Sequence, residues 1–280
     1  AYAPGEGLID LYGGRSDLHA CLMRCVGDPE ERFAEDALRI LRLYRFAARF
    51  GFSIDPPTAQ AAQELCAHLD CVSVERIEEE LAKLLSAPAP AAYLDEKILG
   101  VVLPELSPEA LAAAKPVVDA CPAGTEDLPV RWAALLMSLG TRRTLRRLRC
   151  SNACIEETAV LVREVVSGVP VSLNIYARRL LGKYNLCTVQ RLAALGTALQ
   201  PERSADFAAL SELAERLDAD GVCCRVSQLA VNGRDLMAAG VPAGPGIRKV
   251  LEALLDGVIR AEYPNEKPAL LAAAQKIIAS

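Results

Sequence analysis

Apolar residues recur every three or four positions along most of the chain, which is the spacing of amphipathic helices. The clearest example runs from residue 33 to residue 50 and places four residues on the buried side of a helix: Leu38, Leu41, Tyr44 and Ala48. Asp28 is a suitable N-cap with Pro29 in the first helical position, and Gly51 is a suitable C-terminal residue. The pattern predicts a helix over 33–50.

The same spacing predicts further helices after this point. They are expected over residues 59–69, 74–85, 91–101, 107–119, 128–139, 141–149, 154–167, 172–182, 187–198, 203–217, 232–239, 245–260 and 266–279. Breaks are expected at 121–129, 167–170 and 218–222, where residues that favour turns gather. Two short strands are predicted at 7–12 and 21–26, linked through Gly13-Gly14. The sequence therefore predicts a mainly α fold that begins with a β-hairpin.

Composition agrees with this fold and sets limits on function. Hydrophobic residues make up 52% of the 280 residues, whereas aromatic residues make up 5%. Alanine and leucine dominate, which favours helix over strand. The formal net charge of −5 argues against a uniformly basic protein that coats nucleic acid, although it leaves room for local basic patches.

The ten cysteines form no C-x-x-C pair, and the chain has only two histidines. A zinc site would have few ligands to use, and we expect free thiols in a reducing cytosol. The longest apolar runs are short and rich in alanine, so neither a signal peptide nor a membrane span is predicted.

An array of arginines occupies one side of the predicted helix over 33–50. Asp36 and four arginines follow one another at intervals of three or four residues: Arg39, Arg42, Arg45 and Arg49. One interpretation is a solvated face with ion pairs such as Asp36–Arg39. The other is an anion-binding surface, because neighbouring guanidinium groups repel unless an anion lies among them, and a triphosphate matches their forked geometry.

Asp36 and Arg39 also have the chemistry to distinguish bases. A carboxylate accepts a hydrogen bond from an exocyclic amine, and a guanidinium donates to a ring nitrogen or carbonyl oxygen. Cytosine and adenine each present an amine beside an acceptor, whereas uracil and guanine do not present that combination on the same edge. A fixed Asp/Arg pair is therefore suited to selecting C and A.

The stretch RFAEDALRILRLYRFAARFGF, residues 32–52, resembles the nucleotide-recognition helix of the class II tRNA nucleotidyltransferase / poly(A) polymerase family. The neighbouring motifs GEGLIDLYGGRSDL, RCVGDPEERF, VSVERIEEEL and LPEL follow in the order typical of that family. Near the C-terminus, LAVNGRDLMAAGVPAGPGIRKVLEALLDGVI resembles the tail of CCA-adding enzymes. The resemblance implies four parts: the end of a nucleotidyltransferase head (1–28), a neck (29–88), a helical body (89–168) and a tRNA-binding tail (169–280).

The resemblance also implies roles for the arginine array. Asp36 and Arg39 would form a protein template for incoming CTP or ATP, with Glu35 as an orienting carboxylate. Arg42 and Arg45 would bind the nucleotide, most naturally at its phosphates. Arg49 continues the stripe with a weaker assignment.

The catalytic motifs of the family are not found in this sequence. Its Asp-x-Asp pair on a strand and its Arg-Arg-Asp motif do not occur, and Asp218-Ala-Asp220 falls in a predicted turn. The resemblance implies Mg²⁺ bound by residues upstream of Ala1, so we assign no catalytic or metal-binding residue here and expect this chain alone not to add nucleotides. Asp10 would lie near those metal ions or would cap a turn.

The middle of the chain resembles a degenerate phosphohydrolase module. The run AALLMSLG places Met137 and Ser138 where such modules carry metal ligands, and these two side chains bind hard divalent ions poorly. No hydrolase activity is therefore expected.

Basic residues follow directly in a short helix, from which we predict contacts to RNA phosphates through three arginines: Arg142, Arg146 and Arg149. A solvated face is the alternative. The cluster of Arg178, Arg179 and Lys183 is interpreted as such a face.

A glycine-rich loop in the tail precedes the last but one helix. The backbone amides around Gly244 and Gly246, with Arg248 and Lys249 nearby, are suited to a backbone phosphate, although a simple helix–loop–helix turn has the same pattern. The resemblance implies that this end contacts the elbow of tRNA.

The sequence thus predicts a cytoplasmic tRNA nucleotidyltransferase that adds CCA to tRNA 3′ ends, with tRNA, CTP and ATP as partners. The alternatives are a poly(A) polymerase or A-adding enzyme of the same family, and a non-catalytic RNA-binding or scaffold protein. The sequence does not indicate an oligomeric state.

Overall fold

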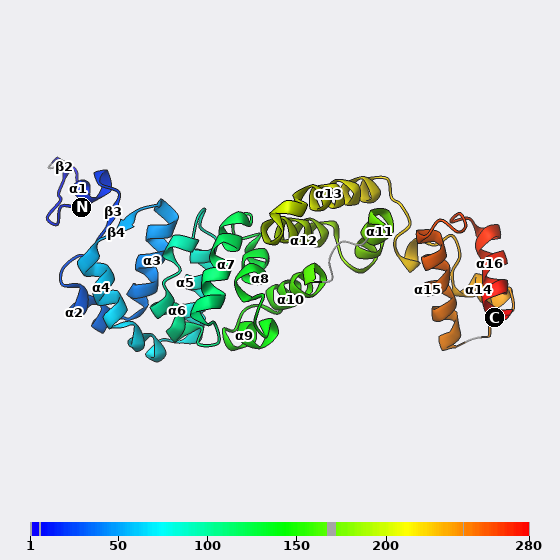
Figure 1. The fold of residues 1–280 in the computed structure, drawn as a ribbon, viewed down its shortest axis with the longest axis horizontal. Coiled ribbons are helices and arrows are strands. Elements are labelled where there is room, and N and C mark those ends of the chain that lie inside the picture. Colours follow the sequence, from blue (N-terminus) through cyan, green and yellow to red (C-terminus); the bar gives the residue numbers. More distant parts are fainter. Residues whose placement is uncertain (1, 6, 167–171, 243, 280) are drawn as a thin grey trace. The chain divides into compact units, whose positions relative to one another are not determined.

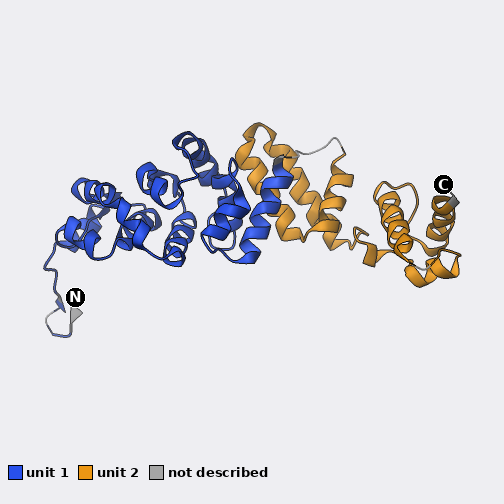
Figure 2. Cartoon of the chain, turned by 90° about the horizontal axis from the view of Figure 1, so that it is seen from below, with its two compact units in different colours: residues 1–166 blue, residues 167–280 orange. Residues whose placement is uncertain are grey.

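A computed structural model describes residues 2–5, 7–166, 172–242 and 244–279. The chain divides into two compact units, residues 1–166 and residues 167–280 (Figure 2). Helices account for most of the described residues in both units, so the predicted mainly α fold is confirmed (Figure 1). The predicted break at 167–170 lies outside the described residues.

The strands of the first unit are very short and differ from the predicted hairpin. β1 (Tyr2–Ala3) pairs antiparallel with β2 (Gly7–Leu8). β3 (Leu22–Met23) pairs parallel with β4 (Ser53–Ile54), which follows the arginine-rich stretch. The predicted pairing of 7–12 with 21–26 is therefore wrong.

The reason is a short helix, α1 (Gly14–His19), where the sequence predicted a turn. The carboxylate of Asp10 accepts hydrogen bonds from the backbone amides of Gly14 and Arg15, both at 2.9 Å. A side chain that satisfies the first amides of a helix stabilises its start. Asp10 thus follows β2 as a helix cap and is not part of a strand, which is the second of the two roles considered for it.

The arginine-rich stretch forms two helices instead of one. α2 (Pro29–Glu35) begins after Asp28, which accepts a hydrogen bond from the Glu30 amide at 2.9 Å as expected of an N-cap. α3 (Leu38–Phe50) ends at Gly51, whose positive φ of 67° is the left-handed conformation that glycine adopts readily. Between them Asp36 has extended backbone angles (φ −150°, ψ 99°), so the continuous helix predicted over 33–50 is broken there.

The remaining elements of the first unit lie within a few residues of the predicted helices, except that the helices predicted over 59–69 and 91–101 are each divided into two elements. They are α4 (Pro56–Glu64), η1 (Cys66–Cys71), α5 (Val74–Leu85), η2 (Ala91–Tyr93), α6 (Glu96–Val102), α7 (Pro108–Ala120), α8 (Leu128–Leu136), α9 (Thr141–Arg147) and α10 (Asn152–Val166). α3 packs against α5, and α8 packs between α7 and α10. The predicted apolar side of α3 is buried at Leu38, Leu41, Tyr44 and Ala48, which confirms the face.

The second unit contains α11 (Leu173–Lys183), α12 (Leu186–Leu199), η3 (Pro201–Arg203), α13 (Ser204–Ala219), η4 (Val226–Gln228), α14 (Gly233–Ala238), α15 (Pro245–Ile259) and α16 (Lys267–Ala279). α12 packs on α13, and α15 packs on α14 and α16 (Figure 1). The last three helices share a small core that includes Leu236, Leu254 and Leu270.

Candidate nucleotide-binding site

Asp36 lies at the break between α2 and α3, and both of its carboxylate oxygens are hydrogen-bonded. Oδ1 accepts from the Leu38 amide at 3.2 Å and therefore caps α3, while Oδ2 accepts from Arg76 Nη2 of α5 at 3.0 Å. Partial burial raises the pKa of Asp36, but the hydrogen bonds from Arg76 and Leu38 outweigh it and hold the pKa below its ordinary value. Asp36 is thus a fixed, ionised acceptor at neutral pH.

Arg39 is oriented by Glu35, the last residue of α2. Arg39 Nη1 donates to Glu35 Oε2 at 2.7 Å and to the Arg32 carbonyl at 3.2 Å, and Arg32 itself donates to both Glu35 oxygens at 3.0 Å. The hydrogen bonds from Arg39 and Arg32 lower the pKa of Glu35. The ion pair considered between Asp36 and Arg39 is not formed, because the break at Asp36 takes its side chain out of the register of α3.

Arg42 and Arg45 share one buried carboxylate, Glu80 of α5. Arg42 Nε lies 3.6 Å from Glu80 Oε1, and Arg45 Nε lies 2.6 Å from Glu80 Oε2. The latter is an ion pair without hydrogen-bond alignment, since neither atom has a well-aligned partner. The guanidinium carbon of Arg45 also lies 3.8 Å from the centre of the Phe46 ring, a cation–π contact. The side chain of Arg42 is 47% exposed, whereas that of Arg45 is 13% exposed.

The anions that the arginine array requires are therefore supplied in part by the protein. Glu35 serves Arg39, and Glu80 serves Arg42 and Arg45. Sequence reasoning missed Glu80 and Arg76, which belong to the motif VERIEEEL and lie about one helical turn apart on α5. Their spacing of four residues indicates that they share one face of a helix. The sequence does not indicate that this face packs against α3, because that contact joins segments distant in sequence.

Two surface hollows adjoin the template residues. One of about 310 Å³ is lined by Arg39 together with Cys25, Val26 and Arg32. The other, of about 400 Å³, is lined by Asp36 and Arg76, with Glu35 also on its wall. The backbones of the predicted template residues lie close together, since the Arg39 amide donates to the Asp36 carbonyl at 3.0 Å. Their side chains line different hollows.

The described residues do not fit a bound Mg²⁺ ion. Within residues 2–5, 7–166, 172–242 and 244–279, no group of three or more His, Cys, Asp or Glu side chains is placed to hold a metal. Met137 follows the end of α8 and Ser138 is exposed. We therefore assign no metal to these residues and derive no chemical step through one.

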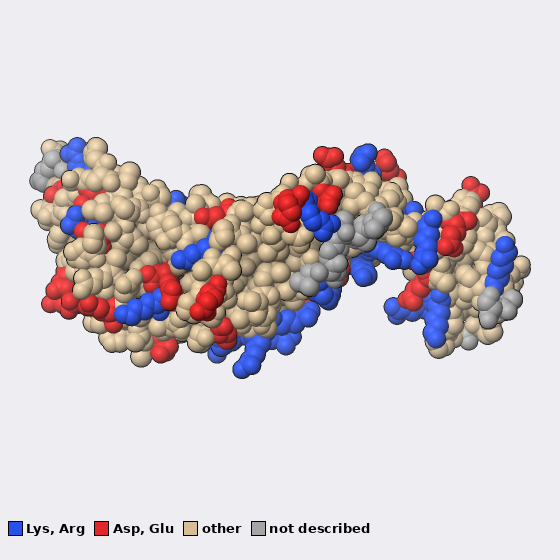
Figure 3. Space-filling model, in the orientation of Figure 1, with Lys and Arg blue, Asp and Glu red and all other residues tan. Residues whose placement is uncertain are grey.

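The basic residues of α9 and Arg149, which lies two residues beyond its end, differ in how they are paired. Figure 3 shows Lys and Arg side chains gathered over this helix. Arg142 pairs with Glu156 at 2.5 Å and Arg149 pairs with Glu75. In the part of the chain that the structure describes, neither Arg143 nor Arg146 has an ion-pair partner, and both are exposed.

In the C-terminal loop, Gly244 precedes α15 with a φ of 139°, which only glycine adopts easily. Gly246 lies in the first turn of that helix. Arg248 is highly exposed and pairs with Glu252 at 2.8 Å, one turn along α15. The structure places Lys249 beside Arg248 on the same turn.

The interpretation of Arg178 as part of a solvated face is wrong. Its guanidinium is buried and donates to the carbonyls of Val258, Ile259 and Cys223 at 3.1, 3.2 and 2.8 Å. A buried arginine that binds backbone carbonyls joins segments that are distant in sequence. Arg179 and Lys183, by contrast, have exposed side chains.

None of the helices among the described residues is long and apolar enough to cross a membrane. All ten cysteines are free thiols in the structure.

Comparisons with known proteins find relatives along most of the chain. Residues 126–274 match the family model for tRNA nucleotidyltransferase domain 2, and residues 51–109 match the model described as "Probable RNA and SrmB- binding site of polymerase A". The chain is 31% identical to a CCA-adding enzyme of Levilactobacillus brevis over 277 residues, which is 95% of this chain and 66% of that protein. It is 32% identical to a CCA-adding enzyme of Limosilactobacillus fermentum, over 97% of this chain and 67% of that protein.

Solved structures extend the likeness to three dimensions. The CCA-adding enzyme of Bacillus stearothermophilus in complex with CTP matches 97% of this chain and 69% of its own, with a TM-score of 0.80 and 28% identity. The Thermotoga maritima CCA-adding enzyme shares the fold, with a TM-score of 0.65 and 18% identity, over 96% of this chain and 67% of its own. The chain spans about two thirds of the length of these relatives.

Proposed function

This chain belongs to the tRNA nucleotidyltransferase family of CCA-adding enzymes, and from that premise we propose that it selects CTP and ATP and holds tRNA for the addition of CCA to tRNA 3′ ends. The observations that support base selection are the fixed carboxylate of Asp36 and the separate orientation of Arg39, three residues along the chain, by Glu35. A cytoplasmic location is part of the same proposal.

Each template residue keeps hydrogen-bonding capacity for a base. A carboxylate offers about four lone-pair positions. Asp36 uses one acceptor position on each oxygen in the bonds to Leu38 and Arg76, which leaves room for an exocyclic amine. Among the described residues, Arg39 donates only through Nη1, so Nε and Nη2 are available to a ring nitrogen or carbonyl. Glu35 acts in this proposal as the residue that positions Arg39.

The two further arginines have different roles in the proposal. Arg42 is half exposed and its contact to Glu80 is long, so it is suited to reach a phosphate. Arg45 is nearly buried, and its main role is to hold α3 against α5 through Glu80.

We assign the tRNA-binding role to α9 and to the N-terminal turn of α15. On α9, Arg143 joins the predicted contacts, because it and Arg146 are exposed and form no ion pair with a carboxylate of the described residues. Arg142 and Arg149 would have to exchange Glu156 and Glu75 for RNA phosphates. On α15 the predicted contacts through Gly244, Gly246, Arg248 and Lys249 stay as proposed.

The test of base selection is an incorporation assay with Arg39→Ala. Residues 1–280 are joined to a catalytic head that supplies metal-binding carboxylates, and each of the four nucleotides is offered separately to tRNA lacking its terminal nucleotides. Loss of one base-reading group should lower the preference for CTP over UTP by about tenfold to a hundredfold. Arg49→Ala is the matched control, because Arg49 lies on the same helix and, within the described residues, forms no ion pair, its guanidinium carbon lying 5.8 Å from the centre of the Phe50 ring.

An Arg39→Ala enzyme that keeps the nucleotide preference of the parent, with an unchanged melting curve, refutes the template role.

A second candidate, the addition of A alone, is favoured by the match of residues 51–109 to a segment of polymerase A. The same assay separates the two functions, because an enzyme that adds only A does not incorporate CTP.

A further inference from the structure

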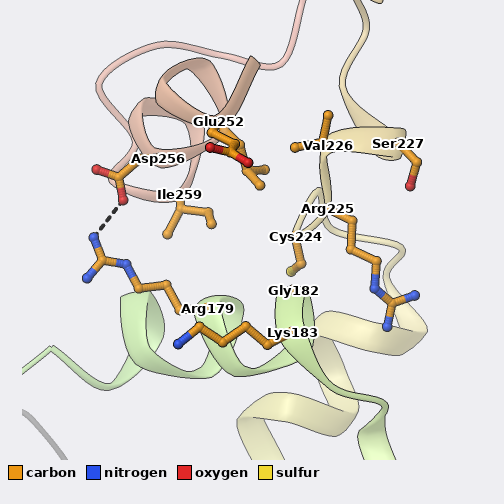
Figure 4. A pocket seen from close by; sticks show the side chains of 11 residues that line it. Arg179, Gly182, Lys183, Cys224, Arg225, Val226, Ser227, Glu252, Asp256 and Ile259 are labelled. Atoms are coloured by element: carbon orange, nitrogen blue, oxygen red, sulfur yellow. Dashed lines mark hydrogen bonds and ion pairs between the residues drawn. The ribbon is translucent and has the colours of Figure 1, made fainter. Parts of the chain in front are cut away.

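A pocket of about 750 Å³ lies in the second unit, between α11, the segment 224–227 and α15 (Figure 4). Its lining residues do not include the predicted contacts on α9 or in the 244–249 loop. Its shape is fixed by two contacts behind its walls.

The first contact is the buried guanidinium of Arg178, which binds the last carbonyls of α15 and the Cys223 carbonyl from α11. The second is the close approach of the 223–224 segment to α11 at Gly182. A Cβ at that position would lie 2.4 Å from the Cys224 carbonyl oxygen, so only glycine allows this contact. All three walls of the pocket are therefore joined before any ligand arrives.

The pocket has an apolar floor and a charged rim. Leu255, Ile259 and Val226 contribute apolar atoms. On the rim, Arg179 Nη2 lies 2.6 Å from Asp256 Oδ1, the ion pair drawn in Figure 4. An apolar floor strengthens the electrostatic interactions of the groups above it, because it keeps water away from one side.

Positive charge exceeds negative charge around this rim. Asp256 is paired a second time, with Arg260 Nε at 2.8 Å, and Glu252 is paired with Arg248. These two carboxylates thus face three cations with which they form ion pairs: Arg179, Arg248 and Arg260.

Two more cations line the pocket. Arg225 donates through Nε to the Leu181 carbonyl and through Nη2 to the Tyr184 carbonyl, two neutral acceptors that leave its charge in place. Lys183 is exposed and has no ion-pair partner in the described residues. The rim therefore has more positive than negative charges, and Lys183 is the cation that forms no ion pair with a described residue.

We propose that this pocket binds a phosphate ester, with Lys183 and Arg179 as the cations that hold it, and that the phosphate belongs to the tRNA backbone. The inference rests on the proposed function, in which the chain binds tRNA. Arg179 can turn from Asp256 to the phosphate without leaving that carboxylate unpaired, because Arg260 also holds it. A free nucleoside triphosphate carries the same chemistry and is the other source of the phosphate.

The experiment measures tRNA binding by this chain over a range of salt concentrations. Lys183→Gln removes one charge from the pocket, and Lys97→Gln removes one from an exposed lysine of α6 in the other unit. We expect Lys183→Gln to weaken binding and to lower the slope of log affinity against log salt by about 1. We expect Lys97→Gln to leave both unchanged. Because both lysines are exposed, melting curves should coincide with that of the parent chain.

A second arm titrates CTP into the same three proteins without RNA. If Lys183→Gln weakens CTP binding and leaves the tRNA slope unchanged, the pocket is a phosphate site for a free nucleotide and the assignment to tRNA is overturned. Equal slopes and equal CTP affinities for the two variants overturn the phosphate site while leaving the proposed function intact. A parent chain that binds neither tRNA nor CTP overturns both.

Discussion

Glu80 is the residue on which the packing of α3 against α5 can be tested most directly. Its carboxylate is 4% exposed and is the partner of both Arg42 and Arg45. Glu80→Gln keeps the shape of the side chain and removes its charge. The two guanidinium groups then lose their shared anion, and Arg45, at 13% exposure, has little access to water that would compensate.

The expected loss follows from this geometry. Removing one partner of a buried ion pair costs about 3–5 kcal/mol. Arg42 is half exposed and the 2.6 Å contact of Arg45 lacks hydrogen-bond alignment, so we expect a loss below that range, about 2–3 kcal/mol. The neighbouring Glu79→Gln is the matched control. Glu79 is 69% exposed and pairs with Lys83 at 3.4 Å, so its loss should cost less than about 0.5 kcal/mol.

Urea unfolding followed by tryptophan fluorescence measures the loss of unfolding free energy in the first unit, which contains Glu80. The chain has one tryptophan, Trp132 of α8, which is fully buried in the first unit. Its emission therefore reports the unit that contains Glu80. If Glu80→Gln unfolds at the same urea concentration as Glu79→Gln, the buried carboxylate does not stabilise the contact between α3 and α5.

Three more predictions concern packing, thiol reactivity and pH. Gly182→Ala should destabilise the second unit by about 1–3 kcal/mol in a thermal melt, because the new Cβ meets a carbonyl oxygen at 2.4 Å, whereas Gly100→Ala, with open space around it, should not. Cys121 is buried and its pKa is raised to about 12, so at pH 8 iodoacetamide should modify it at least about a hundredfold more slowly than the exposed Cys71, as measured by peptide mass spectrometry. The pKa of Asp36 is lower in the folded chain than in the unfolded chain, so the stability it contributes is present above the unfolded value and is lost as the pH falls through the folded value. Urea midpoints at pH 6, 4.5 and 3.5 should therefore fall less steeply for Asp36→Asn than for the parent, and parallel curves would contradict this.

Helical periodicity predicted most of the fold because it is a local property. The apolar face of α3 and the helices after residue 90 follow from residue spacing alone, since each helix buries the side that its own sequence makes apolar. The break at Asp36 was missed because no Gly or Pro marks it. Aspartate competes for backbone amides, however, and its bond to the Leu38 amide starts a new helix. An acidic residue inside a predicted helix was the available signal.

The strand pairing was missed for a different reason. β3 pairs with β4 across the whole of α2 and α3, and two-residue strands carry too little pattern to indicate their partners. The hairpin predicted at the start required a turn at residues 13–17, and capping by Asp10 converted that segment into α1.

The candidate site was predicted at the level of residue type but not of pairing. Sequence reasoning required an anion for the arginines, and part of that anion is Glu35 and Glu80, held by the fold itself. In the proposed function, this changes the role of the bound nucleotide. A nucleotide would not need to neutralise all four arginines, because Arg45 already pairs with Glu80 and Arg39 already pairs with Glu35.

Glu35 and Glu80 thus hold the arginine side chains in place before a ligand binds, so the ligand is not required to neutralise all of their charge. Arg76 and the Leu38 amide hold Asp36, and Glu35 holds Arg39, through atoms that leave acceptor and donor positions of both residues available. Side chains that are already held lose less conformational freedom when a ligand binds, so more of each hydrogen bond to the base contributes to discrimination. In the proposed function, a substitution of Arg76 should therefore lower the preference between bases more than it lowers the affinity for the triphosphate, because the phosphates would meet Arg42 whether or not Asp36 is held in place.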